Sequence, residues 1–163
     1  MKLKKAGRAA MVATALCTML FGAATAGAGT AAAAATGRLA NYGAQQCIVS
    51  ELSGNIHAGP CLPVTRLKQW IWSGKVNDAG GTTFVNNGIG NKCLDSNTSG
   101  HVYTITCNGS DNQRWVVIRR AAGSAFLLQN LETRRYLLQN SNGLYSTQSE
   151  QDLNSRVLRW TIG

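Results

Sequence analysis

Cysteines and histidines are the side chains whose spacing in this sequence could support covalent or metal chemistry. Four of the five cysteines form two pairs of equal spacing, Cys47 with Cys61 and Cys93 with Cys107, each 14 residues apart. Such pairs could close two short disulfide loops or supply thiolates to a zinc ion. Zinc prefers closely spaced Cys and His ligands, which this pattern does not offer, so disulfides are favoured.

The two histidines, His57 and His101, give no support to a hydrolase triad. Neither lies beside a serine or cysteine nucleophile in a recognisable motif. The sequence also contains no glycine-rich phosphate loop and no recognised nucleic-acid module. We therefore expect a protein that is not an enzyme, needs no metal or cofactor, and does not bind nucleic acid.

Residues 1–35 have the pattern of a secretory signal peptide. Four basic residues precede an uncharged stretch from Ala9 to Gly37, whose most apolar part runs from Met11 to Phe21. Later Gly and Thr residues dilute the stretch, unlike a membrane anchor of about 20 apolar residues. We expect cleavage after Ala35, with a site after Ala26 as the alternative, and release of a secreted, extracellular protein that has no membrane anchor.

Export would change both the cysteine count and the charge. Cys17 leaves with the signal peptide, and the remaining four cysteines enter a compartment where disulfides persist. We therefore predict that the two pairs of 14-residue spacing are disulfides. The chain has 16 Lys and Arg against 7 Asp and Glu, a net charge of +9. Loss of four basic residues leaves a mature charge of about +5.

Three tryptophans divide the mature chain into repeats. Trp70, Trp115 and Trp160 lie 45 residues apart in both steps, and a period in this range indicates a fold built from one repeated unit. The first cysteine of each pair precedes its tryptophan by 23 residues in one unit and 22 in the next. The sequence thus predicts one domain, residues 36–163, made of repeats at about 36–78, 79–121 and 122–163.

Each repeat contains four short β-prone runs separated by turn-forming residues. In the second repeat these runs are 82–86, 92–95, 102–106 and 115–118. In the third they are 125–128, 136–138, 144–147 and 158–162, and in the first they lie around 39–42, 47–49, 56–58 and 70–72. Twelve strands in three units predict a closed or nearly closed all-β structure with few exposed edges.

The second repeat resembles the repeat of ricin B-type lectins. It opens with Cys93-Leu94-Asp95, continues with Cys107-Asn108-Gly109 and closes with Asn112-Gln113-Arg114-Trp115, while the family repeat has a Cys-Leu-Asp start and a Gln-x-Trp end. The resemblance covers essentially all of residues 36–163. It implies an all-β domain, a β-trefoil of three pseudo-symmetric four-stranded repeats, in which three hairpins cap a six-stranded barrel and the repeat tryptophans anchor the core.

The other two repeats preserve the scaffold more than the motif. The first has Cys47-Ile48-Val49 and Lys68-Gln69-Trp70, and the third has Tyr136-Leu137-Leu138 and Leu158-Arg159-Trp160. Neither has a glutamine two places before its tryptophan. In both, an aliphatic side chain takes the place of the aspartate, and it cannot accept a hydrogen bond from a sugar hydroxyl.

The resemblance implies a shallow carbohydrate pocket in the second repeat. Carried over by position, its residues are Asp95, Tyr103, Asn112 and Gln113. A carboxylate accepts hydrogen bonds from sugar hydroxyls, amides both donate and accept, and an aromatic face covers the C–H patch of the ring. The family's usual stacking aromatic lies two residues before the second cysteine, where this chain has Ile105. Tyr103, on the same strand face, could replace it.

Each candidate residue also has a purely structural interpretation. Tyr103 could be a packed strand aromatic, and Asp95 could cap backbone N–H groups in a turn. The side chains of Asn112 and Gln113 could tie their loop by internal hydrogen bonds.

The favoured function is that of a secreted, lectin-like module that binds a glycan or polysaccharide through at most one intact pocket. A trefoil protease inhibitor, which would present a rigid exposed loop, is one alternative. A structural or interaction trefoil whose sugar sites have decayed is another. The pairs Arg119-Arg120 and Arg134-Arg135, with Arg156 and Arg159, could also form a patch for an anionic polymer, although arginines scattered over a solvated face explain them more simply.

Overall fold

The computed structural model describes residues 34–119, 125–140, 143–148 and 156–163. The predicted signal peptide lies outside the described residues except for Ala34 and Ala35, and Arg120 also lies outside them. Strands dominate the described part, which has three short 3-10 helices and no longer helix. None of its helices is long and apolar enough to cross a membrane.

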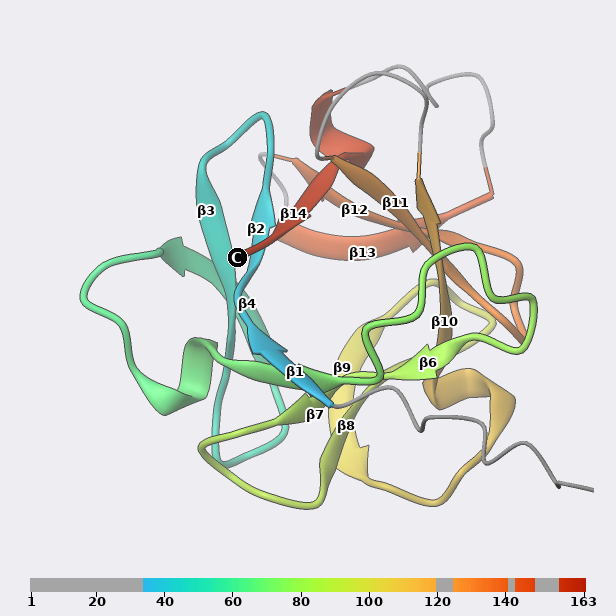
Figure 1. Cartoon of the computed structure of the whole chain (residues 1–163), viewed down its shortest axis with the longest axis horizontal. Helices are drawn as coiled ribbons and strands as arrows, with labels where there is room; N and C mark the ends of the chain where they lie inside the picture. Colours follow the sequence, from blue (N-terminus) through green and yellow to red (C-terminus); the bar gives the residue numbers. More distant parts are fainter. Residues whose placement is uncertain (1–33, 120–124, 141–142, 149–155) are drawn as a thin grey trace, which may run out of the picture. The chain divides into compact units, whose positions relative to one another are not determined.

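Each predicted β-prone run contains a strand, in three successive repeats (Figure 1). The first repeat contains β1 (Ala35–Gly37), β2 (Leu39–Asn41), β3 (Gln46–Ser50), β4 (Ile56–Pro60), η1 (Arg66–Lys68) and β5 (Trp70–Trp72). The second contains β6 (Thr82–Thr83), β7 (Val85–Asn86), β8 (Lys92–Ser96), β9 (Val102–Thr106), η2 (Asp111–Gln113) and β10 (Arg114–Arg119). The third contains β11 (Phe126–Asn130), β12 (Tyr136–Asn140), β13 (Gly143–Thr147), η3 (Arg156–Leu158) and β14 (Trp160–Ile162).

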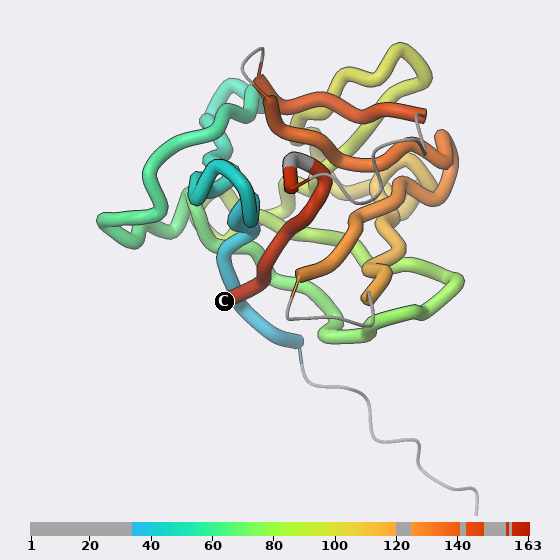
Figure 2. Tube along the Cα trace, turned by 90° about the horizontal axis from the view of Figure 1, so that it is seen from above, coloured from blue at the N-terminus to red at the C-terminus, as the bar shows by residue number. Residues whose placement is uncertain are grey.

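Six segments of the chain close a barrel. β5 pairs with β1 and β7, β10 pairs with β6 and β11, and β14 pairs with β11 and β2. Only Arg38 separates β1 from β2, and only Phe84 separates β6 from β7, so these pairings return to their starting point. The last strand therefore lies beside the first segment, as the red and blue traces show (Figure 2).

Three hairpins, β3–β4, β8–β9 and β12–β13, complete the repeats. Hydroxyl groups join neighbouring hairpins, with 3.0 Å between Ser50 Oγ and Thr104 Oγ1 and 2.9 Å between Ser96 Oγ and Ser146 Oγ. Gln139, at the position equivalent to these two serines, instead donates from Nε2 to Gln46. A six-stranded barrel with three hairpins is the β-trefoil that the resemblance to ricin B-type repeats implied.

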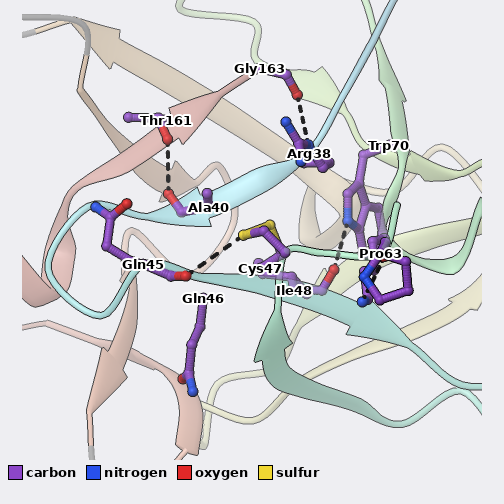
Figure 3. Close-up of a disulfide and its surroundings, with 12 residues drawn as sticks. Arg38, Ala40, Gln45, Gln46, Cys47, Ile48, Pro63, Trp70, Thr161 and Gly163 are labelled. Carbon is purple, nitrogen blue, oxygen red and sulfur yellow. Dashed lines mark hydrogen bonds between the residues drawn. A yellow bond between two sulfur atoms is a disulfide. The ribbon is translucent and has the colours of Figure 1, made fainter. Parts of the chain in front are cut away.

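The three repeat tryptophans are core anchors, as predicted. Trp70, Trp115 and Trp160 are completely buried. Each indole Nε1–H donates, over 3.3, 3.0 and 3.0 Å respectively, to the carbonyl of the second residue in its own repeat motif: Ile48, Leu94 and Leu137. Figure 3 shows the first of these bonds. Each tryptophan thus ties the barrel strand that ends a repeat to the hairpin of that repeat.

Both predicted disulfides are present. Cys47 is bonded to Cys61 and Cys93 to Cys107, with Cα–Cα distances of 4.9 and 5.0 Å. In each hairpin the bond links the first strand to the loop that leaves the second, and Figure 3 shows the disulfide of Cys47. The loops after β4 and β9 are therefore held covalently against their hairpins.

Replacement of Cys93 and Cys107 by serine should lower the free energy of unfolding by about 2–4 kcal/mol, because the unfolded chain gains conformational freedom. Denaturant unfolding beside the wild type measures the loss. Peptide mapping of the wild-type protein without reductant should recover both disulfides, each within its own repeat. Free thiols, or a bond between repeats, would contradict the assignment.

The first strand was not predicted. Ala35 pairs with Trp72 at the start of β1. Cleavage after Ala35 would remove the first residue of this strand, whereas the alternative cut after Ala26 would leave it intact. The site of cleavage remains a prediction.

Candidate functional site

Asp95 and Tyr103 face each other across the second hairpin. They are paired residues of β8 and β9, and Asp95 is only 4% exposed. Leu94, the residue before Asp95, is completely buried in the main core. Because successive side chains of a strand point to opposite faces, Asp95 is directed away from that core, to the outer face of the hairpin.

A hydrogen bond joins the side chains of Tyr103 and Asp95. Burial of Tyr103, this hydrogen bond and the charge of Asp95, in that order, raise the pKa of the phenol above its ordinary value. The shift favours the protonated form, so below its ordinary pKa Tyr103 is a neutral hydroxyl donor. Its contact with Asp95 is lost only as the pH rises through the raised pKa of the folded protein. The carboxylate and the aromatic ring are thus held together as one unit.

An open hollow of about 440 Å³ lies over this pair. Its walls are formed by side chains of β8, β9 and the two loops that follow these strands: Asp95, Asn97, Thr98, Tyr103, Ile105, Asn108, Ser110 and Asn112. The volume falls within the range of small-molecule sites, about 300–1,000 Å³. Hydrogen-bonding groups and apolar surface both line it, which suits a ligand that has both.

Ile105 provides the aliphatic part of the hollow. It lies two residues after Tyr103 on the same face of β9, and it is 43% exposed. The position at which the ricin B-type family carries its stacking aromatic is therefore exposed and aliphatic here, and Tyr103 supplies the aromatic ring of the hollow instead.

Asn112 and Gln113 have different environments although they are neighbours in η2. Asn112 lines the hollow, and its Nδ2 donates to the carbonyl of Ser96 over 2.8 Å. Gln113 is completely buried. Its Oε1 accepts from the backbone N–H of Asn108 at 2.8 Å, and its Nε2 donates to the carbonyl of Thr106 at 3.1 Å. The structure thus brings three of the four predicted residues to the hollow and places Gln113 behind the loop.

Gln113→Leu should destabilise the domain, because it leaves the N–H of Asn108 and the carbonyl of Thr106 without their partner. An unsatisfied buried polar group costs about 1–3 kcal/mol, so the expected loss is of that order or greater. Leu158 occupies the equivalent position of the third repeat, two residues before Trp160, so the size and shape of a leucine side chain suit this position of the fold. Denaturant unfolding beside the wild type measures the loss. Equal stability of the two proteins would rule out this role.

Four lining residues were not identified from the sequence: Asn97, Thr98, Asn108 and Ser110. Asn108 was noted only as part of the repeat motif Cys107-Asn108-Gly109, and no binding role was assigned to any of the four. Asn97 and Asn108 do bond locally, since Oδ1 of each accepts a backbone N–H, from His101 at 3.0 Å and from Ser110 at 2.9 Å. One signal for them was available in the sequence. Asn97 and Thr98 follow the first strand of the hairpin that carries Asp95 and Tyr103, and Asn108 and Ser110 follow its second strand.

The other two repeats do not reproduce this chemistry. The pairs equivalent to Asp95 and Tyr103 are Val49 with His57 and Leu138 with Tyr145. Val49 and Leu138 are each 8% exposed, and neither has a polar side-chain atom. His57 instead contacts Glu51, with 3.0 Å between Nδ1 and Oε1. Within the described hairpins, the buried carboxylate is thus specific to the second repeat.

The arginines proposed for an anionic polymer have separate contacts. Arg119 lies over the ring of Phe126, 5.4 Å from its centroid, and Arg135 donates to the carbonyl of Ser146 over 3.5 Å. The anionic partner remains a prediction. Among the residues that the structure describes, no group of three or more His, Cys, Asp or Glu side chains could hold a metal ion.

No protein-family model and no curated protein matches the sequence, but many solved structures share the fold. The designed threefold-symmetric protein ThreeFoil matches with a TM-score of 0.65 and 17% identity over 78% of this chain and 96% of that one. SeviL, solved bound to asialo-GM1 saccharide, matches with a TM-score of 0.64 and 14% identity over 80% and 98%. The hemolytic lectin CEL-III matches with a TM-score of 0.62 and 22% identity over 77% and 29%. These likenesses confirm the β-trefoil fold.

Proposed function

We propose that this chain is a carbohydrate-binding module whose sugar site is the hollow of the second repeat. The observation that carries the proposal is the convergence of Asp95, Tyr103 and Asn112, from β8, β9 and η2, on that one hollow. The module binds and does not cleave.

Each group has a distinct role in this proposal. The Asp95 carboxylate accepts hydrogen bonds from neighbouring sugar hydroxyls, each worth about 1.5–3 kcal/mol because the acceptor is charged. The Tyr103 ring covers the C–H face of the sugar. Asn112 adds a further polar contact at the rim. Gln113, which is buried, holds the loop and does not touch the ligand.

The comparisons support a binding function through the shared fold. SeviL was solved with a saccharide. CEL-III is a lectin, and the match covers 29% of the CEL-III chain. Secretion is supported by the two disulfides, which persist in oxidising compartments. A β-trefoil hosts more than one function, so the proposal rests on the hollow itself.

A glycan array probed with the secreted, disulfide-bonded protein tests the proposal. We expect binding to a restricted group of glycans. Addition of the free sugar should displace the protein from them. No binding across the array would reject the function.

A second candidate function is protease inhibition, favoured by the loop that follows β4. Leu62 and Val64 are 69% and 49% exposed there. The Cys61 disulfide anchors the start of this loop, and Lys68 Nζ donates to the carbonyl of Pro63 over 3.0 Å. An inhibition assay with proteases that accept apolar side chains tests this candidate, and inhibition by a protein that binds no glycan would favour it.

A further inference from the structure

A buried asparagine recurs at one place in all three repeats. Asn41, Asn86 and Asn130 are the last residues of β2, β7 and β11, and all three are completely buried. Oδ1 of each accepts one or two backbone N–H groups of the turn that follows its strand. The side chain therefore shapes the turn that leads from a barrel strand into the hairpin of the repeat.

Asn130 uses both halves of its side-chain amide. Its Oδ1 accepts from the backbone N–H and from the hydroxyl of Thr133, over 3.0 and 3.2 Å. Because a backbone N–H can only donate, the atom that faces Thr133 is the oxygen, and Nδ2 faces the other way. Nδ2 donates to the carbonyl of Asn112 over 2.6 Å and to that of Arg114 over 3.5 Å. Contacts at both ends thus fix the orientation of this amide.

From these contacts we infer that Asn130, a residue of the third repeat, positions Asn112 in the hollow of the second. Asn130 itself does not line the hollow. Its Nδ2 holds the backbone of Asn112, while the side chain of Asn112 donates to the carbonyl of Ser96 over 2.8 Å. Asn112 is therefore held by both its main chain and its side chain. The inference rests on the proposed function and adds a positioning residue to it.

The turn after β11 reinforces this contact. The backbone N–H of Leu131 donates to the carbonyl of Arg114 over 2.8 Å, and that of Glu132 donates to the carbonyl of Asp111 over 3.4 Å. The backbone before and after Asn112 is thereby bonded to the third repeat. The hairpin of that repeat, residues 136–147, contains no Asp or Glu in its sequence. The third repeat thus supports a carboxylate site that its own hairpin lacks.

Asn86 makes the equivalent contact one repeat earlier. Its Nδ2 donates to the carbonyl of Leu67 over 2.9 Å. Leu67 is the middle residue of η1, as Asn112 is the middle residue of η2, but its side chain has no polar atom. The bond between the buried asparagine and the helical turn is therefore a feature of the fold, and it concerns a ligand only where the turn carries Asn112. Asn86 is the matched control for Asn130.

Asn130→Ser, compared with Asn86→Ser, tests the inference. Serine can still accept an N–H of its own turn but is too short to reach the helical turn, so both melting temperatures should fall by similar amounts. Calorimetry uses whichever of galactose, glucose, mannose and N-acetylglucosamine the wild type binds most tightly. The affinity of Asn130→Ser should fall about fivefold or more, roughly the effect of one hydrogen bond, while that of Asn86→Ser stays within about twofold.

Amide hydrogen exchange in the absence of sugar gives a second readout. The N–H of Gln113 closes η2 and that of Lys68 closes η1, each by a bond of 3.0 Å to the carbonyl three residues earlier. The N–H of Gln113 should exchange faster in Asn130→Ser than in Asn86→Ser, and the N–H of Lys68 should show the reverse. A general loss of stability would accelerate the two sites alike.

The outcomes separate this inference from the proposed function. Equal sugar affinity of the two variants, or equal exchange of Gln113 in both, would overturn the inference but leave a sugar site. If Asn130→Ser does not fold, exchange in the wild type decides: sugar binding should slow the N–H of Leu131, and an unchanged rate would overturn the inference. No binding of the wild type to the four sugars or to the glycan array would reject the proposed function and the inference together.

Discussion

Trp115→Ala should unfold the domain or lower its free energy of unfolding by about 3–5 kcal/mol, the usual cost of truncating a buried aromatic. Trp115 is completely buried, and its indole donates to the carbonyl of Leu94 over 3.0 Å. The substitution leaves both a cavity and an unsatisfied carbonyl. Because small domains are stable by only about 5–15 kcal/mol, the loss is a large part of the total. Circular dichroism during denaturant unfolding measures it.

Two further variants separate the causes of this loss. Trp115→Phe retains an aromatic ring but removes the N–H, so its loss should be smaller than that of the alanine variant. Tyr42→Ala truncates an aromatic that is 44% exposed, and it should change stability by less than about 1 kcal/mol. A melting temperature of Trp115→Ala equal to that of the wild type would refute the role of the tryptophans as core anchors.

The repeats, the strands and both disulfides were predictable because they depend on residues that recur at regular spacing. Trp115 and Trp160 mark the same place in successive repeats, and each makes the same hydrogen bond in the structure. β1 was not predictable because the segment Ala35–Gly37 has no β-branched pattern of its own apart from Thr36. Its extended conformation comes from pairing with β5, a contact between segments distant in sequence.

The candidate site was predictable only in part. The motif indicated Asp95, Tyr103 and Asn112 as neighbours, and all three line one hollow. For Gln113 it left ligand contact and internal hydrogen bonding both open, because the direction of a side chain in a single helical turn depends on the tertiary packing, and the structure shows internal hydrogen bonding. Asn97 and Asn108 were missed since an asparagine in a turn is explained by its local hydrogen bond.

Asp95→Ala should reduce sugar binding below detection while the domain stays folded. Asp95 is the one carboxylate among the residues that line the hollow, and it also holds the Tyr103 hydroxyl. Loss of two hydrogen bonds to a charged acceptor, at about 1.5–3 kcal/mol each, corresponds to a fall in affinity of about 100-fold or more. A single shallow site has little affinity to lose. Calorimetry with a sugar identified on the array measures the loss, and a melting curve verifies the fold.

The most direct test of the sugar site is the affinity of Asp95→Asn, measured by calorimetry beside the wild type and Asp78→Asn. Asp95→Asn preserves the shape of the side chain and removes its charge. Asp78→Asn removes the same charge elsewhere and retains the oxygen that accepts the N–H of Gly80. With all three proteins folded, we predict equal affinity for the wild type and Asp78→Asn and at least a tenfold loss for Asp95→Asn. Wild-type affinity in Asp95→Asn would contradict a sugar site in the second repeat.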